Sequence, residues 1–183
     1  MKIKETPIAG LLIFEPQIFE DARGAFFESF NKKIFDEATG GMFEFVQDNQ
    51  SLSHKDVLRG LHFQKPPFAQ GKLVRVIKGA VLDIAVDIRI GSPTYGKHYS
   101  VELSEENNRM LWIPPGFAHG FKSLEHNTIF SYKCTNYYEP SSEGTILWND
   151  PSLGIDWGSD DCLISEKDKI GEEFSNFASH FQM

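Results

Sequence analysis

The stretch from Lys72 to Arg89 constrains the fold more than any other part of the sequence. It reads KLVRVIKGAVLDIAVDIR, two runs rich in β-branched residues that meet at Lys78-Gly79. Alternation of apolar and polar residues, as in the second run, is typical of a strand with two different faces. We therefore predict a β-hairpin whose second strand has one apolar face (Leu82, Ile84, Val86, Ile88) and one wet or functional face (Asp83, Asp87).

Further segments of this kind predict an all-β core. Strands are expected at His98–Leu103, Met110–Ile113 and Thr128–Thr135, with a turn at Ser92–Gly96. Aromatic residues make up 13% of the chain, including 16 Phe, and Gly and Pro occur in turn-like clusters throughout. This composition and spacing favour a β-sandwich or barrel, and we expect a single domain spanning residues 1–183.

Helix signals are few. Asn31 can cap a short helix over Lys32–Thr39 that ends at Gly40-Gly41. Ser165-Glu-Lys-Asp168 resembles a capping box that opens a C-terminal helix. We therefore expect an N-terminal arm of strands and a helical C-terminal tail around the β core.

Charge and cysteine content exclude several classes of protein. The 183 residues carry 18 Lys and Arg against 26 Asp and Glu, a net charge of −8, which does not suit a nucleic-acid partner. Two cysteines, Cys134 and Cys162, are too few for a disulfide framework and suit a reducing cytoplasm. The longest apolar run, Ile8–Phe14, is too short to span a bilayer, and the first residues do not resemble a signal peptide. We expect a cytoplasmic protein with no membrane partner.

The segment Val57–Gln64 contains the first candidate for chemistry. In a regular strand Leu58, Gly60, His62 and Gln64 share one face, so His62 would point into a space that Gly60 leaves open. Histidine side chains titrate near neutral pH, which suits proton transfer. The alternative interpretation is a core histidine whose nitrogens are bonded to backbone carbonyls.

A second candidate lies in Trp112–Phe121, where His119 follows Pro114-Pro115-Gly116. This pattern resembles the P-x-G-x-x-H motif of cupins, a jelly-roll superfamily. Metal-binding cupins also have an H-x-H motif followed by Glu, whereas this chain has His62-Phe63-Gln64. Because an amide oxygen replaces imidazole poorly on a transition metal, the resemblance implies a cupin cavity with no metal and no cofactor.

Seven ordered blocks carry a more specific resemblance. They lie at residues 21–28, 45–50, 58–64, 70–72, 115–121, 132–138 and 141–150, and the tail aligns through Trp157 and Ser165–Asp168. Together they resemble the dTDP-4-dehydrorhamnose 3,5-epimerase (RmlC) family. The resemblance implies a cupin-like jelly-roll β-sandwich with short flanking helices, homodimeric and metal-independent, that acts as an isomerase in dTDP-L-rhamnose biosynthesis.

The implied reaction converts dTDP-4-dehydro-6-deoxy-D-glucose to dTDP-4-dehydro-L-rhamnose. C3 and C5 both adjoin the C4 ketone, so each can lose a proton to form an enolate. By resemblance His62 is the base, Asp168 holds its tautomer, Tyr132 is the acid on the opposite face, and Lys72 binds the oxyanion. Taken singly, Tyr132 would more often be a core aromatic with its hydroxyl at the rim, Lys72 a solvated strand-end residue and Asp168 the fourth residue of a capping box.

The resemblance also implies a set of substrate-binding residues, to which Lys72 belongs as well. They are Arg23, Arg59 and Lys167 for the diphosphate, Gln47, Asp48 and Asn49 on a neighbouring strand, Glu28 and Glu143 as acceptors for the nucleoside and sugar, and His119. Arg23 could instead form a surface ion pair with Asp21. Arg59 would face away from His62 in a regular strand, which implies a local bulge, a contact around an edge, or a contact from a second subunit.

Three rival functions stay open on the sequence alone. A related cupin could invert a single carbon or act as a ketoisomerase, although Tyr132 favours full epimerisation. A non-enzymatic ligand-binding cupin would exchange no protons with solvent. A metal-dependent cupin oxygenase would contain stoichiometric metal.

Overall fold

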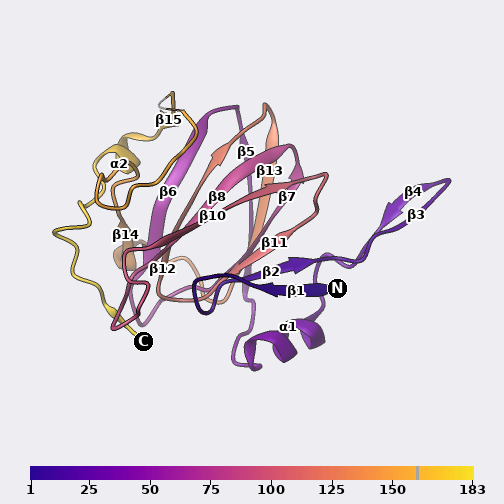
Figure 1. Cartoon of the computed structure of the whole chain (residues 1–183), viewed down its shortest axis with the longest axis horizontal. Coiled ribbons are helices and arrows are strands. Elements are labelled where there is room, and N and C mark those ends of the chain that lie inside the picture. Colours follow the sequence, from indigo (N-terminus) through magenta and orange to yellow (C-terminus); the bar gives the residue numbers. More distant parts are fainter. Residues whose placement is uncertain (160) are drawn as a thin grey trace.

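The chain folds into two facing β-sheets, as seen in the computed structural model, which describes residues 1–159 and 161–183 (Figure 1). The first sheet has the order β1-β2-β11-β7-β13-β5 and the second β10-β8-β12-β6-β14. The first contains β1 (Lys2–Glu5), β2 (Leu12–Glu15), β5 (Gln47–Ser53), β7 (Lys72–Lys78), β11 (Met110–Ile113) and β13 (Thr128–Cys134). The second contains β6 (Val57–Gln64), β8 (Ala80–Asp87), β10 (His98–Ser104), β12 (Phe117–Ser123) and β14 (Glu143–Thr145), with β15 (Leu163–Ile164) beside β6.

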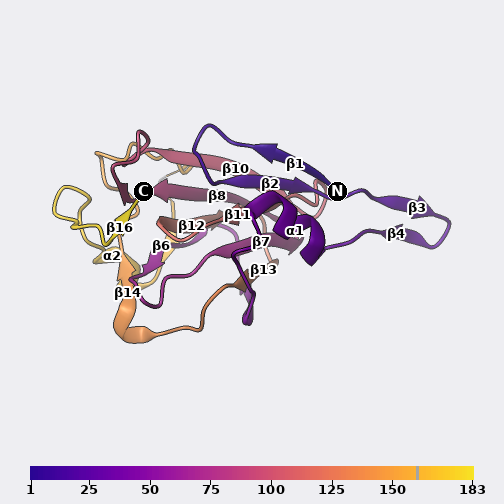
Figure 2. The ribbon, with the colours of Figure 1, turned by 90° about the horizontal axis from the view of Figure 1, so that it is seen from below.

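Smaller elements lie around the sandwich. They are the hairpin strands β3 (Phe19–Asp21) and β4 (Gly24–Phe26), the paired strands β9 (Arg89–Ile90) and β16 (Phe181–Gln182), the helices α1 (Lys32–Thr39) and α2 (Glu166–Lys169), and a 3₁₀ turn at Pro140–Ser142. The β3–β4 hairpin projects away from the sandwich in both ribbon views (Figure 1, Figure 2). Among the described residues, no helix has the length and apolar character needed to cross a membrane.

The predicted hairpin between β7 and β8 is wrong, because the two strands lie in opposite sheets. The turn at Gly79 (φ +80°) carries the chain from one sheet to the other. Alternation did not reveal this, since both faces of β8 are covered. Asp83 and Asp87 are fully buried, so the face that carries them is not wet.

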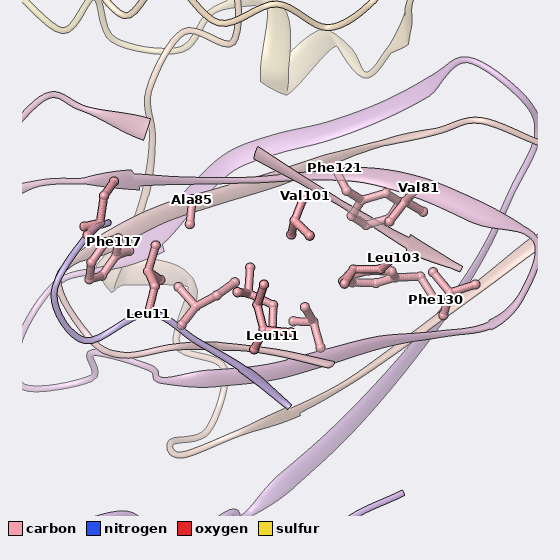
Figure 3. Close-up of a cluster of buried hydrophobic side chains, with 14 residues drawn as sticks. Leu11, Val81, Ala85, Val101, Leu103, Leu111, Phe117, Phe121 and Phe130 are labelled. Atoms are coloured by element: carbon pink, nitrogen blue, oxygen red, sulfur yellow. The ribbon is translucent and has the colours of Figure 1, made fainter. Parts of the chain in front are cut away.

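Two apolar clusters explain why both faces of the second sheet are buried. The larger one fills the space between the sheets and includes Val81 and Ala85 of β8 together with Phe121 and Phe130 (Figure 3). The other covers the outer face, where Ile84 and its neighbours pack under the C-terminal segment. Whether both faces of β8 are buried therefore depends on the other segments that pack on them, and the sequence of β8 alone does not show it.

Several local predictions are confirmed. The strands β10, β11 and β13 lie within a residue of the expected bounds. Helix α1 begins after Asn31, whose Oδ1 accepts a hydrogen bond from the Ile34 amide, and ends at Gly40 with φ +80°. The helical C-terminal tail is wrong, because α2 is a single turn and the tail around it is mostly irregular.

Candidate active site

A cavity of ≈ 440 Å³ opens between the two sheets. A second cavity of ≈ 230 Å³ adjoins it, and both are lined by His62, Lys72 and Tyr132. Arg59, His119, Lys167 and Asp168 line the larger cavity, whereas Gln47, Asn49 and Glu143 line the smaller one. The structure thus brings together ten of the predicted site residues, from both sheets and the C-terminal segment.

Strand register places the side chains of the first sheet. Tyr132 on β13 pairs with Asn49 on β5, and two residues further along Cys134 pairs with both Gln47 and Lys72. Because side chains alternate along a strand, this register directs Lys72, Tyr132, Asn49 and Gln47 to the same inner face. Asp48 lies between two of them, faces outward and pairs with Lys133 at 3.0 Å.

A bulge in β6 places Arg59 and His62 on the same side. His62 pairs with His119 and Arg59 pairs with Phe121, so that two residues of β6 lie opposite one residue of β12. The extra residue reverses the alternation, and Leu58 packs on the outer face with Leu61 and Phe63. The expectation that Leu58 and His62 share a face is therefore wrong, and the local bulge inferred from Arg59 is the arrangement that the structure shows.

Glycine is required at the centre of this bulge. Gly60 has φ +138°, a conformation that L-residues with a side chain rarely adopt. A Cβ at this position would lie 2.5 Å from the Cα of Gly120 on the neighbouring strand. The two glycines let β6 and β12 approach closely beside His62.

His62 and Asp168 form a close pair at the cavity wall. The distance between His62 Nε2 and Asp168 Oδ1 is 2.7 Å, and Asp168 Oδ2 accepts a hydrogen bond from the Gly60 amide at 3.3 Å. Burial alone would raise the pKa of the Asp168 carboxyl, but hydrogen bonding to His62, the His62 charge and the Gly60 amide together lower it below 3.8. The carboxylate is thus held ionised against the imidazole.

Asp168 takes this position although the sequence suggested a capping box. Ser165 caps α2 as expected, since its Oγ accepts a hydrogen bond from the Asp168 amide at 3.2 Å. The Asp168 side chain, however, contacts His62 and Gly60 across the fold. One residue therefore serves as a cap position and as the partner of the histidine.

Tyr132 and Lys72 lie on the sheet that faces His62. Burial raises the pKa of the Tyr132 phenol, and the nearby Arg59 charge opposes this only in part. Burial lowers the pKa of the Lys72 ammonium, and the negative charges of Asp83 and Glu143 counteract the shift. Lys72 Nζ makes no hydrogen bond or ion pair with any residue that the structure describes, so it is available to a ligand.

Other charged side chains lie in the cavity walls or directly behind them. Both carboxylate oxygens of Asp83 lie 3.0 Å from His119 Nε2. Glu143 Oε2 accepts bonds from Lys167 Nζ at 2.5 Å and from Tyr138 Oη at 2.7 Å. Tyr138 was not among the residues predicted for the site, although it lies within one of the blocks that carry the family resemblance.

Gln64 has a structural role next to the site. Its Nε2 donates to the carbonyls of Phe68 and Tyr137 at 2.7 and 3.1 Å, and its Oε1 accepts from the Glu139 amide at 2.8 Å. The amide that replaces the second cupin histidine therefore ties down two loops. Within the described part of the chain, no group of three or more His, Cys, Asp or Glu residues is placed to hold a metal.

Arg23 and Glu28 do not reach the cavity of their own chain. The Arg23 side chain is 90% exposed near the tip of the β3–β4 hairpin and pairs with Asp21 at 2.5 Å. Glu28 follows the hairpin and accepts a hydrogen bond from Asn31 at 3.0 Å. The structure therefore does not bring these two residues to the other predicted site residues.

A scan against protein-family models matches residues 5–176 to dTDP-4-dehydrorhamnose 3,5-epimerase. The chain belongs to this family. A dTDP-4-dehydrorhamnose 3,5-epimerase of Shigella flexneri is 55% identical over 174 residues, covering 95% of this chain and 96% of that protein. The predicted resemblance is therefore confirmed, and this family member is an isomerase.

Solved structures of the epimerase family have the same fold. The Elizabethkingia anophelis dTDP-4-dehydrorhamnose 3,5-epimerase superposes with a TM-score of 0.91 at 49% identity, covering 96% of this chain and 97% of that chain. The Legionella pneumophila epimerase RmlC, in complex with dTDP-4-keto-L-rhamnose, gives a TM-score of 0.93 at 49% identity, covering 97% and 94%. The predicted cupin-like β-sandwich is thereby confirmed.

Proposed function

We propose that this chain inverts C3 and C5 of dTDP-4-dehydro-6-deoxy-D-glucose to give dTDP-4-dehydro-L-rhamnose, in dTDP-L-rhamnose biosynthesis. The observation that carries the proposal is the placement of His62 and Tyr132 on opposite sheets, lining the same two cavities. A sugar ring between them has a base on one side and an acid on the other. The product of this reaction is the ligand named for the Legionella relative.

His62 removes the proton in this mechanism. The Asp168 carboxylate accepts a hydrogen bond from His62 Nε2, so the neutral imidazole carries its proton on Nε2. Nδ1 is then free to accept a proton from carbon. The protons at C3 and C5 are acidic enough for this step because loss of either gives an enolate with the C4 ketone. The ionised Asp168 then stabilises the imidazolium that forms.

Lys72 stabilises the enolate oxygen. Its ammonium has no partner among the described residues, and it lines both cavities. A charge interaction in a site of low dielectric is much stronger than in water, so a developing oxyanion is favoured beside it. The oxyanion in turn favours the protonated form of Lys72, against the burial that lowers its pKa.

Tyr132 returns a proton from the opposite side. Because burial raises its pKa, the phenol keeps its proton at neutral pH and can give it to the carbanion. Protonation on the side opposite to His62 inverts the carbon. After each event solvent takes the proton from His62 and returns one to Tyr132, so two such events, at C3 and at C5, give the doubly inverted sugar.

Binding of the diphosphate involves positive side chains at the cavity and on a second protomer. Arg59 and Lys167 line the larger cavity of one protomer. We propose a homodimer in which the β3–β4 hairpin of one copy brings Arg23 and Glu28 to the cavity of the other. Phe26, 70% exposed on that hairpin, supports a covering partner. Asp48 faces away from the cavity and is left out of this proposal.

A cytoplasmic location is part of the same proposal. The buried Cys134 carries a free thiol, as expected in a reducing compartment. Sugar nucleotides are charged, so they cross a membrane only with a transporter. An enzyme that acts on them in the compartment where it is synthesised needs no such transporter. Fractionation of the producing cells, with the protein detected by an antibody, tests the location directly.

Proton NMR of dTDP-4-dehydro-6-deoxy-D-glucose with the enzyme in deuterated water tests the function. Deuterium should enter at both C3 and C5, with formation of the L-rhamno product, and His62→Ala should abolish both. Exchange and inversion at one carbon alone would identify a mono-epimerase. A ketone signal moved to C3 would identify a ketoisomerase, and binding without exchange a ligand-binding cupin.

A further inference from the structure

A buried lysine outside the catalytic cavity ties the C-terminal segment to the sandwich. Lys122 on β12 is only 2% exposed. Its Nζ lies 2.6 Å from Ser159 Oγ and 3.2 and 3.3 Å from the carbonyls of Ser159 and Trp157. Asp56 Oδ1 lies 3.5 Å away and compensates the charge. The three donors of the ammonium therefore have acceptors on a single loop, residues 157–159.

The surroundings of this lysine are otherwise apolar. Its register partners Leu58 and Leu82 belong to the cluster that covers the outer face of the second sheet, as does Trp157. Burying an ammonium in such a place is costly unless it is fully hydrogen-bonded. The loop must therefore keep its position if Lys122 is to keep its partners.

The segment that leaves this loop carries the partner of the catalytic histidine. Leu163 on β15 donates a hydrogen bond from its amide to the Asp56 carbonyl at 2.8 Å, and Ser165 then caps α2, which contains Asp168. A helix of one turn has no stability of its own in water. Leu163 and Ile170 are 60% and 83% exposed, so within β15 and α2 apolar packing comes mainly from Ile164, which lies against the outer cluster.

We propose that Lys122 is a positioning residue for the epimerase reaction. Its ammonium fixes the 157–159 loop, and through β15 and α2 it fixes Asp168 against His62. Catalytic groups displaced by about 1 Å can lose about a hundredfold in rate, so an anchor remote from the sugar can control turnover. The proposal rests on the proposed function for its kinetic effect, but not for its effect on the segment.

Lys122→Met tests the anchor, because it removes the charge and the donors and keeps an unbranched side chain. We expect kcat for dTDP-4-dehydro-6-deoxy-D-glucose to fall about tenfold, well short of the hundredfold of a full displacement. Lys78→Met is the matched control: Lys78 is exposed at the end of β7 and should leave kcat unchanged. A kcat for folded Lys122→Met within twofold of the control would overturn the proposal.

A double-mutant cycle separates positioning from a general loss of stability. If Lys122 acts through Asp168, Lys122→Met should lower kcat by less than about twofold in an Asp168→Asn background. The same factor in both backgrounds would mean that Lys122 does not act through Asp168. Where Lys122→Met does not fold, Ser159→Ala removes only the shortest bond and should give a smaller loss with the same dependence on Asp168.

Amide hydrogen exchange provides a test that needs no activity. Lys122→Met should speed exchange in β15 and α2 and leave β7 and β13 as they are in Lys78→Met. Unchanged exchange in β15 and α2 would overturn the proposal. If the wild-type protein exchanges no protons of the sugar nucleotide, the proposed function fails, while this measurement still decides whether Lys122 holds the segment.

Discussion

Replacing Asp168 by Asn is the most informative single test of how His62 acts as the base. The variant keeps the shape of the side chain, and its Oδ1 can still accept a hydrogen bond from the Gly60 amide. In the wild type this amide lies 3.3 Å from Asp168 Oδ2. Its NH₂ group then faces His62 Nε2, where a carboxylate oxygen lies at 2.7 Å in the wild type. An NH₂ group can only donate, so Nε2 must become an acceptor and the ring proton must move to Nδ1. Nδ1, the proposed acceptor of the sugar proton, then carries a proton of its own and cannot take another.

The expected losses of activity and of stability differ in size. Loss of general base catalysis typically costs about 10²–10⁴-fold, which corresponds to about 2.7–5.4 kcal/mol in the activation free energy. The hydrogen bonds from residue 168 to His62 and to Gly60 both persist in the variant, but the carboxylate charge is lost. A hydrogen bond to a charged group stabilises a fold by about 1 kcal/mol more than a neutral one. We therefore expect kcat to fall at least a hundredfold while the free energy of unfolding falls by only about 1–3 kcal/mol.

Steady-state kinetics and urea unfolding of the same preparation check both numbers. Asp36→Asn on helix α1 is a matched control, because this half-buried aspartate pairs with Lys32 of the same helix and does not line the cavity. It should have a normal kcat. A folded Asp168→Asn protein with kcat within tenfold of the control would refute the assignment of Asp168 as the residue that sets the tautomer of His62.

Three further predictions concern the bulge, acid stability and metal. Gly60→Ala places a Cβ 2.5 Å from Gly120 Cα, so unfolding in urea should show a loss of about 1–3 kcal/mol, and an unchanged midpoint would contradict the packing. Because the pKa of Asp168 is depressed in the fold, its contribution to the free energy of unfolding is complete above pH 3.8 and is lost as the pH falls through the lower native pKa. Asp168→Asn should therefore flatten the dependence of the unfolding free energy on pH in this range. Parallel pH dependences in the variant and the wild type would count against the His62–Asp168 pair. Activity should survive dialysis against EDTA, since Gln64 is bonded to loop backbone; loss that zinc, iron or manganese restores would contradict this.

Local signals in the sequence predicted the elements that depend on local physics. Helix α1 is delimited by a capping Asn31 and by Gly40, and strand β13 by its own alternation. The partner of β8 depends on which surfaces the rest of the chain covers, and no pattern within Lys72–Arg89 contains that information. For the same reason the buried state of Asp83 was not predictable, because its partner His119 lies on another strand.

The candidate site was predicted by resemblance, and the structure adds what the residue patterns alone could not. Arg59 and His62 are three residues apart and would face opposite ways in a regular strand, so only the bulge at Gly60 explains how both line the cavity. Lys122 was not singled out, since a lone lysine in a strand is usually solvated and its acceptors lie 35 and 37 residues further along the chain. Arg23 does not line the cavity, because the β3–β4 hairpin projects away from the sandwich, and no local pattern in the sequence indicates that direction.

Deuterium exchange in Tyr132→Phe tests the two-sided mechanism most directly. His62 and its partner Asp168 remain, so the enolate still forms and solvent deuterium should enter at C3 or C5, returned to the original side by the imidazolium. Formation of the inverted product should fall by about 10²–10⁴-fold, because the acid on the facing sheet is gone. The aromatic ring stays, and the melting temperature should hold. If exchange and inversion instead fall by the same factor in a folded Tyr132→Phe protein, Tyr132 is not simply the acid and the account of inversion is wrong.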